Sequence, residues 1–407
     1  MIHKSLYFSN YLFIFLFFPS FITGVFIPNL VCVTFAFLNL IFNFDKLKKI
    51  FLSNLYPSYF FLSFYFIIVL SSLFSNHSIH SLESSFFYFM YYIYCLSLII
   101  LFSNSINFRV LFFFCGILTC FILSLDAIYE LFNGSNTLGF SSIEGRIAGL
   151  FGSRWLLGRY LVYILPILIG IYFLEKEKLK RFRNFFFITI LLTSVVILFS
   201  GERAAFIMFF IYLFLLLLFF INKLTVIKIL QVISLLIILF CFPFLFSEIS
   251  ERLRDNFIIY LTSNNYEQNQ YLSMFVTSWK MFIENPFIGI GPNNFRYLCS
   301  DPIYYVSKWS CSTHPHSITF QLLAEIGIIG FIAVYSLLAY FIYKSFRLLR
   351  SNIFSNITFG MYSLQCSVII YLFPLMITGN FFLSWYGFIY FLPISLFIVY
   401  SNKVKLK

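Results

Sequence analysis

Residues 204–222 read AAFIMFFIYLFLLLLFFIN, a run without a single charged side chain. An α-helix needs about 20 consecutive apolar residues to cross the roughly 30 Å hydrocarbon core of a bilayer. Runs of this kind recur along the chain, which is 61% hydrophobic and 10% charged and contains 62 Phe among 407 residues. They are continuous rather than alternating, which argues against a β-barrel. The sequence therefore predicts an all-α, polytopic integral membrane protein.

We predict twelve membrane spans. Their ranges are 6–22, 24–43, 57–74, 86–102, 110–128, 156–174, 184–199, 204–222, 226–246, 317–342, 361–378 and 381–401. The chain then divides into an N-terminal bundle of nine spans (1–246), one long loop (247–316) and three C-terminal spans (317–407). Long loops are usually functional or disordered. An amphipathic helix expected over 271–284 favours an ordered loop.

Positive charge predicts the orientation of these spans. With the N-terminus in the cytoplasm, every strongly basic short connection lies on the cytoplasmic side, as the positive-inside tendency expects. The basic residues concerned are Lys46, Lys48, Lys49, Arg109, the cluster within 176–183, Lys223, Lys228, Lys344, Arg347, Arg350 and the tail 403–407. Both termini are then cytoplasmic. The net charge of +12 reports topology and not a nucleic-acid surface.

Two of the eight cysteines, Cys299 and Cys311, fall in the long loop, and the other six fall in apolar spans. An oxidising compartment would allow the pair to close a disulfide; two free thiols are the alternative. No zinc-ligand spacing of Cys and His occurs.

The stretch CSTHPHSITFQLLAEIGIIG (311–330) leads from the loop into the tenth span. Pro315 is favoured in a first helical turn, so the span is expected to begin beside His316. A histidine there can titrate and can meet a lipid headgroup, although an interfacial anchor is the plainer interpretation. His314 is a second candidate. Glu325, deeper in the span, is expected to be structural or to line a polar cavity.

Two further motifs lie on the same predicted side. Asn285–Gly291 reads NPFIGIG, whose glycines permit a tight turn without Cβ atoms. Ser200–Arg203 reads SGER, and Arg203 begins a span at the outer surface, against the usual bias of positive charge. Such an arginine suits an anionic ligand, as does Arg146, while snorkelling to lipid phosphates is the alternative for each.

Together these motifs resemble the O-antigen ligase and polymerase family. The matches are the SGER turn, the NPFIGIG segment, and His316 followed by Glu325, Gly327 and Gly330; GRIAGLFGSRWLLGRYL (145–161) is similar as well. The resemblance is specific over about 145–331. It implies a metal-independent glycosyltransferase without a cofactor, at the periplasmic face of the bacterial inner membrane. Such an enzyme moves a glycan from undecaprenyl diphosphate to a lipid A core.

The resemblance also implies roles for single residues. His316 would be the catalytic base, and Arg203, Arg146 and Arg296 would bind the diphosphate. Many relatives carry an arginine where this chain has Tyr271. Candidates to replace it are Arg252, Arg254 and Arg296.

Three alternatives remain open. A polymerase would join lipid-linked repeat units with the same machinery. A flippase or other transporter would place charges deep in several spans, whereas these spans are nearly free of charge. A metal site could combine His77 and His80 with His314 and His316, but no matching carboxylate motif accompanies them.

Overall fold

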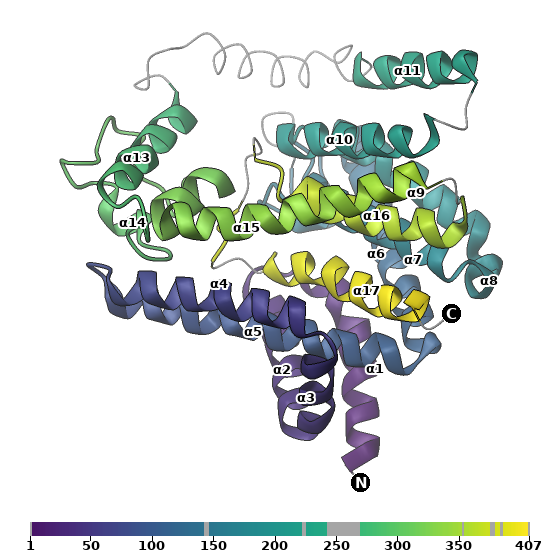
Figure 1. The fold of residues 1–407 in the computed structure, drawn as a ribbon. Coiled ribbons are helices and arrows are strands. Elements are labelled where there is room, and N and C mark those ends of the chain that lie inside the picture. The colour runs from purple at the N-terminus through teal and green to yellow at the C-terminus, as the bar shows by residue number, and fades with distance from the viewer. Residues whose placement is uncertain are drawn as a thin grey trace.

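The computed structural model describes residues 2–141, 146–221, 225–241, 269–351, 354–374, 379–382 and 386–405. These residues are mostly helical, and an isolated β-bridge pairs Ser135 with Ser141. The helices are α1 (Ile2–Ser20), α2 (Phe26–Phe42), α3 (Phe44–Ser53), α4 (Leu55–Leu73), α5 (Ser78–Asn104), α6 (Ile106–Asn133), α7 (Leu157–Leu174), α8 (Lys176–Leu179), α9 (Arg183–Phe199), α10 (Arg203–Phe220), α11 (Val226–Cys241), α13 (Gln270–Glu284), α14 (Phe295–Leu298), α15 (Ile318–Arg350), α16 (Asn356–Tyr371) and α17 (Gly387–Lys405) (Figure 1).

Seven helical segments are long and apolar enough to cross a membrane: α4, α5, α6, α7, α8–α9, α10 and α15. The pair α2–α3, bent by 95°, would make an eighth. Each predicted range overlaps a helix, although residues 242–246 and 375–378 of these ranges lie outside the described residues and α17 begins only at Gly387. The helices outside these eight segments do not meet the criteria of length and apolar composition. The all-helical membrane architecture is therefore confirmed, while the number twelve stays a prediction.

The helix α3 was not expected from the sequence, which suggested only a basic connection there. It carries Lys46, Lys48 and Lys49 and turns sharply away from α2. Its mixture of lysines and apolar residues suits a helix that lies at a membrane surface.

The helix α7 lies in the interior of the bundle, because nearly all of its side chains are buried. It packs against α16, α9, α10 and α6, while α17 packs against α5. Aromatic side chains dominate this core; Phe17, Phe18, Phe112 and Tyr160 are all fully buried. The position of α7 matters for function, because its first turn meets the SGER segment.

The two ends of the bundle differ in character. Figure 1 shows α13, α14 and the start of α15 at one end, and α8, the last turn of α15 and the C-terminus at the other. The basic residues of α8 and of the end of α15 therefore lie away from the loop helices.

Candidate active site

The NPFIGIG segment forms backbone hydrogen bonds with α15 at a break in that helix. Gly327 interrupts the helix with φ 66° and ψ −170°. The loop supplies hydrogen bonds on both sides of the break: the amide of Gly291 donates to the carbonyl of Glu325 (2.9 Å), and the amide of Ile328 donates to the carbonyl of Pro286 (2.8 Å). Loop and helix are thereby joined through their backbones.

Two motif glycines make this crossing feasible. A Cβ on Gly289 would lie 2.4 Å from the carbonyl carbon of Glu325, and a Cβ on Gly327 would lie 2.3 Å from that of Phe287. Both glycines also have positive φ, which favours glycine. The spacing of the two motifs therefore has a physical cause, since each glycine admits the backbone of the other segment.

The buried side chain of Glu325 binds the loop that contains the NPFIGIG segment. The side chain is fully buried, and its two oxygens accept hydrogen bonds from the amide of Phe295 (3.1 Å) and from Nε2 of Gln321 (2.9 Å). The first of these bonds ties the start of α14 to α15. Glu325 thus makes the contacts of a structural residue.

A chain of amide side chains continues from Gln321 to Arg296. Gln321 donates to Asn380 (2.9 Å), Asn380 donates to Oδ1 of Asn293 (2.9 Å), and Nη2 of Arg296 donates to the same oxygen (2.7 Å). Gln321, Asn293 and Asn380 were not identified from the sequence. Two features of the sequence could have indicated them: Gln321 and Asn380 are polar residues within apolar stretches, and Asn293 follows the glycine-rich turn.

The two histidines of the loop lie together. The ring centroids of His314 and His316 are 4.2 Å apart, and Nε2 of His316 is 3.1 Å from Oγ of Ser312. Tyr271 meets His316 edge-on at 6.1 Å. Tyr271, which stands where many relatives carry an arginine, therefore lies beside His316, the candidate base.

The expected start of the tenth span needs one correction. Pro315 does not lie in the first helical turn, because His316 has a left-handed backbone (φ 58°) and α15 begins at Ile318. The helix still begins beside His316, two residues after it.

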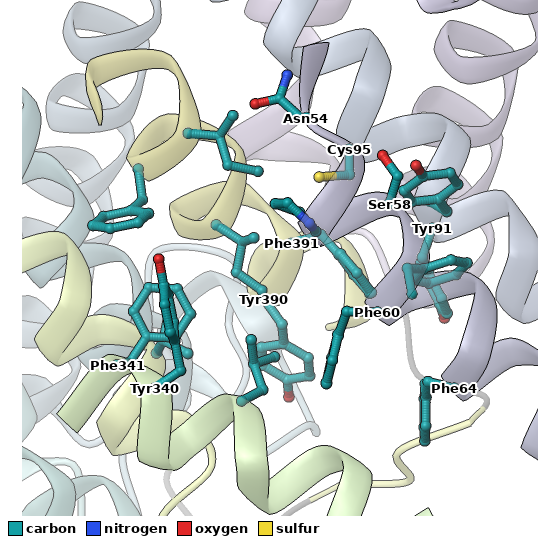
Figure 2. A pocket seen from close by; sticks show the side chains of 18 of the residues that line it. Asn54, Ser58, Phe60, Phe64, Tyr91, Cys95, Tyr340, Phe341, Tyr390 and Phe391 are labelled. Atoms are coloured by element: carbon teal, nitrogen blue, oxygen red, sulfur yellow. The ribbon is translucent and has the colours of Figure 1, made fainter. Parts of the chain in front are cut away.

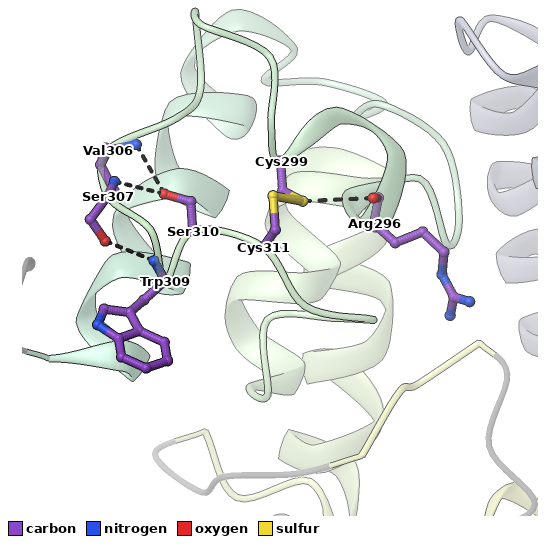
Figure 3. The surroundings of a disulfide bond; sticks show 7 residues. All are labelled: Arg296, Cys299, Val306, Ser307, Trp309, Ser310 and Cys311. Atoms are coloured by element: carbon purple, nitrogen blue, oxygen red, sulfur yellow. Dashed lines mark hydrogen bonds between the residues drawn. A yellow bond between two sulfur atoms is a disulfide. The ribbon is translucent and has the colours of Figure 1, made fainter.

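Cys299 and Cys311 are joined by a disulfide, with their Cα atoms 5.1 Å apart (Figure 3). Cys299 directly follows α14, so the bond links this helix to the segment that leads into His314. Oγ of Ser310, next to the bond, accepts hydrogen bonds from two backbone amides at 2.9 and 3.0 Å. The approach to the histidines is thus tethered at several points.

A second polar group forms where the SGER turn meets α7. Glu202 is 7% exposed, and its carboxylate accepts hydrogen bonds from the amides of Gly158 (2.7 Å) and Arg159 (3.3 Å). It thereby satisfies donors that the first turn of α7 leaves open. Burial raises the pKa of Glu202 to about 7, against the opposing charges of Arg159 and Arg146. Arg203 is half-buried at the first position of α10.

Arg146 belongs to the same group. Its guanidinium lies 4.2 Å from the ring centroid of Trp155. The amide of Ile147 donates to the carbonyl of Ser200 (3.2 Å), and Glu130 accepts hydrogen bonds of 3.2 and 2.6 Å from the two following amides. The structure therefore brings Arg146 and the SGER turn together, as two candidate diphosphate residues require.

The remaining candidates do not join these groups. Arg252 and Arg254 lie outside the described residues. The rings of His77 and His80 contact Tyr297 at 5.3 and 5.0 Å. Across the described ranges no group of three or more His, Cys, Asp or Glu residues could hold a metal ion.

A cavity of about 560 Å³ opens between α4, α5, α15, α16 and α17. Its wall is mainly aromatic and aliphatic (Figure 2), with Phe60, Phe64, Tyr91, Phe341 and Phe391 among the lining residues. It reaches from Asn54, where α4 begins, to Phe381, next to Asn380. An apolar chamber thus runs along the helices as far as the amide chain that ends on Arg296.

Comparison with known proteins concerns two polar groups: the one around His316 and Glu325, and the one where the SGER turn meets α7. No curated protein matches the chain. Residues 188–335 match the family model of O-antigen ligase, a range that contains the SGER turn, the NPFIGIG segment, His316 and Glu325, and that leaves out Arg146. Over residues 188–335 the chain is therefore similar to the O-antigen ligase family, the family that these motifs predicted.

Proposed function

We propose that this protein is an O-antigen ligase, which moves a polysaccharide from undecaprenyl diphosphate to a sugar of the lipid A core. The observation that carries the proposal is an apolar cavity that reaches Phe381, whose amide donates to Gln321 in the chain of amide side chains that ends on Arg296. A donor with a long hydrocarbon chain and an anionic head needs both environments.

The reaction assigns one task to each part of the site. The acceptor hydroxyl loses its proton to His316 while its oxygen bonds to the anomeric carbon of the glycan. The bond from that carbon to the diphosphate oxygen breaks, and the electron pair leaves with the diphosphate. Arg203, Arg146 and Arg296 stabilise the growing charge through charge-assisted hydrogen bonds.

The site faces the periplasm in this proposal, and the protein lies in the inner membrane with both termini in the cytoplasm. The separation of the basic helix ends from the α13–α14 end supports this orientation, since short cytoplasmic connections are enriched in Lys and Arg.

The chemistry also favours a transferase over a transporter. Asp126, Glu130 and Glu325 lie within helices, but each accepts backbone or side-chain hydrogen bonds. Structural contacts of this kind account for these acids without a transport path.

Reconstitution tests the proposal. Purified protein in nanodiscs, supplied with undecaprenyl-diphosphate-linked O-antigen and a lipid A core acceptor, should form core-linked polysaccharide. Absence of product with active donor and acceptor preparations would reject the assignment.

A further inference from the structure

Arg159 is a charged residue inside the bundle that the proposed reaction leaves without a task. It lies in the first turn of α7, and its Nε atom is shielded from solvent without a hydrogen-bond partner. Among the described residues, no hydrogen bond or ion pair engages its guanidinium group. The residue as a whole is partly exposed. A guanidinium carries five donors, and a shielded donor without a partner is costly. Ionisable residues within membrane helices commonly mark a functional site.

Its neighbours do not supply the missing partner. Glu202 lies within electrostatic range, but its oxygens accept the α7 amides, and the one ion pair within 4.0 Å in the described chain joins Arg109 and Glu175. Tyr163, Tyr386 and Tyr390 are also in electrostatic range of the guanidinium. Their hydroxyl groups are neutral at physiological pH and cannot balance the charge of Arg159.

The tyrosines connect Arg159 to the apolar cavity. Tyr390 and Tyr371 line the cavity, and the ring of Tyr163 packs against both at 5.6 and 5.7 Å. Figure 2 shows Tyr390 on the cavity wall. Tyr386 directly precedes α17, whose first residue, Gly387, lines the cavity too. Tyr390 thus lies both on the cavity wall and within electrostatic range of Arg159.

We propose that Arg159 binds a phosphate group of a lipid whose chain occupies this cavity, and that the lipid is the donor's polyprenyl diphosphate. The proposal rests on the function proposed above. A phosphate oxygen can accept two parallel hydrogen bonds from the guanidinium group. Arg159 would then provide a diphosphate contact that Tyr271 cannot.

Direct binding tests this assignment. Wild-type protein, Arg159→Gln and Arg159→Lys are titrated in nanodiscs with undecaprenyl diphosphate, with undecaprenol and with phosphatidylglycerol. Removing a charged hydrogen bond should weaken undecaprenyl diphosphate about 10- to 100-fold in Arg159→Gln. Arg159→Lys should lose less, because it keeps the charge. Affinity for undecaprenol, which has no phosphate, should not change. Arg183→Gln, which removes an exposed arginine at the start of α9, should bind all three lipids as wild type does.

Each other result overturns a defined part of the proposal. Undecaprenyl diphosphate affinity within twofold of wild type in Arg159→Gln would remove the phosphate contact. An equal loss for phosphatidylglycerol would show a general phospholipid site and remove the donor assignment. If Arg159→Gln does not fold, undiminished affinity of Arg159→Lys for the diphosphate, with wild-type affinity for undecaprenol, would remove the two parallel hydrogen bonds that the proposal assigns to the guanidinium group. Failure of wild-type transfer in the reconstituted assay, with Arg159-dependent binding intact, would instead count against the proposed function.

Discussion

His316 has a positive φ of 58°, a conformation that few residues with a Cβ adopt. Such strain costs about 1–3 kcal/mol and persists where the surroundings enforce it, often at functional sites. The disulfide on one side and the start of α15 on the other provide that constraint. The backbone therefore aims the imidazole towards Ser312 and His314.

A substitution series separates the backbone of His316 from its chemistry. His316→Ala and His316→Asn should both lose about 10²–10⁴-fold in transfer rate, because neither can accept the acceptor proton. Asparagine tolerates the left-handed conformation, so its protein should fold as well as wild type. His314→Ala should lose less. Transfer at the wild-type rate by His316→Asn, measured at matched protein levels, would contradict the role of His316 as base.

Substitutions of Arg203 test whether its positive charge is sufficient or whether the planar guanidinium group is also needed. Arg203→Lys keeps the charge but loses the planar fork that suits a phosphate, so a fraction of the activity should remain. Arg203→Ala should lose about 10²–10³-fold, the usual cost of removing one donor to developing charge. Turnover of the lipid-linked donor by both variants in membranes is the measurement. Full activity of the alanine variant would show that Arg203 contacts only lipid phosphates.

Glu202 should make stability depend on pH. Its folded pKa of about 7 exceeds the unfolded value, so its favourable contribution is complete at low pH and is lost as pH rises to 7. Glu202→Gln lacks this titration. The melting temperature of the variant minus that of wild type should therefore increase between pH 5 and pH 8. A difference that stays constant would mean that Glu202 is not buried as described.

Single residues were predictable where a motif or a reactive group marked them. The sequence marked His316 and Arg203 as candidates, and it predicted the Cys299–Cys311 pair, which the structure joins. Asn380 and Gln321 were missed because their importance comes from contacts between distant segments. Asn380, for example, lies 87 positions from Asn293, to which it donates a hydrogen bond.

At the scale of elements, α15 is the main departure from expectation. The sequence predicts one continuous span, whereas the structure breaks it at Gly327 so that residues 286–291 can enter. Hydrophobic length alone cannot reveal such a break, because the carbonyl and amide groups of the loop replace those of the helix. Glu325 consequently lies against the loop, which explains a carboxylate that would be costly in lipid.

Gly327→Ala tests the interlock of loop and helix. The Cβ would meet the carbonyl of Phe287 at 2.3 Å, so the loop must move away. We expect loss of transfer and a lower melting temperature. Gly139→Ala is the matched control, since Gly139 also has positive φ (84°) but nothing lies within 4 Å of its Cβ position. The control should show only the cost of the backbone conformation, about 1–2 kcal/mol. Equal melting temperatures for the two variants would contradict the steric argument.

At the scale of the whole molecule, composition was enough to predict a helical membrane protein. Periodicity and apolar length located nearly every helix. The tilt of α3 and the cavity between α4, α5 and α17 were not predictable, because both depend on how helices pack. The arrangement places the loop helices α13 and α14 at one end of a largely apolar bundle, as the proposed transfer from a lipid-linked donor would require.

The proposed catalytic groups do not distinguish a ligase from a polymerase, because both can use the same base and arginines. Deletion of the gene in its host separates them. For a ligase we expect all long lipopolysaccharide bands to vanish while lipid-linked polymer accumulates, since polymer continues to form but has no route to the core. For a polymerase the core would instead carry a single repeat unit. Complementation with wild type should restore the long bands, and complementation with His316→Asn should not. A single-repeat pattern on electrophoresis would overturn the ligase assignment and leave the shared transfer chemistry in place.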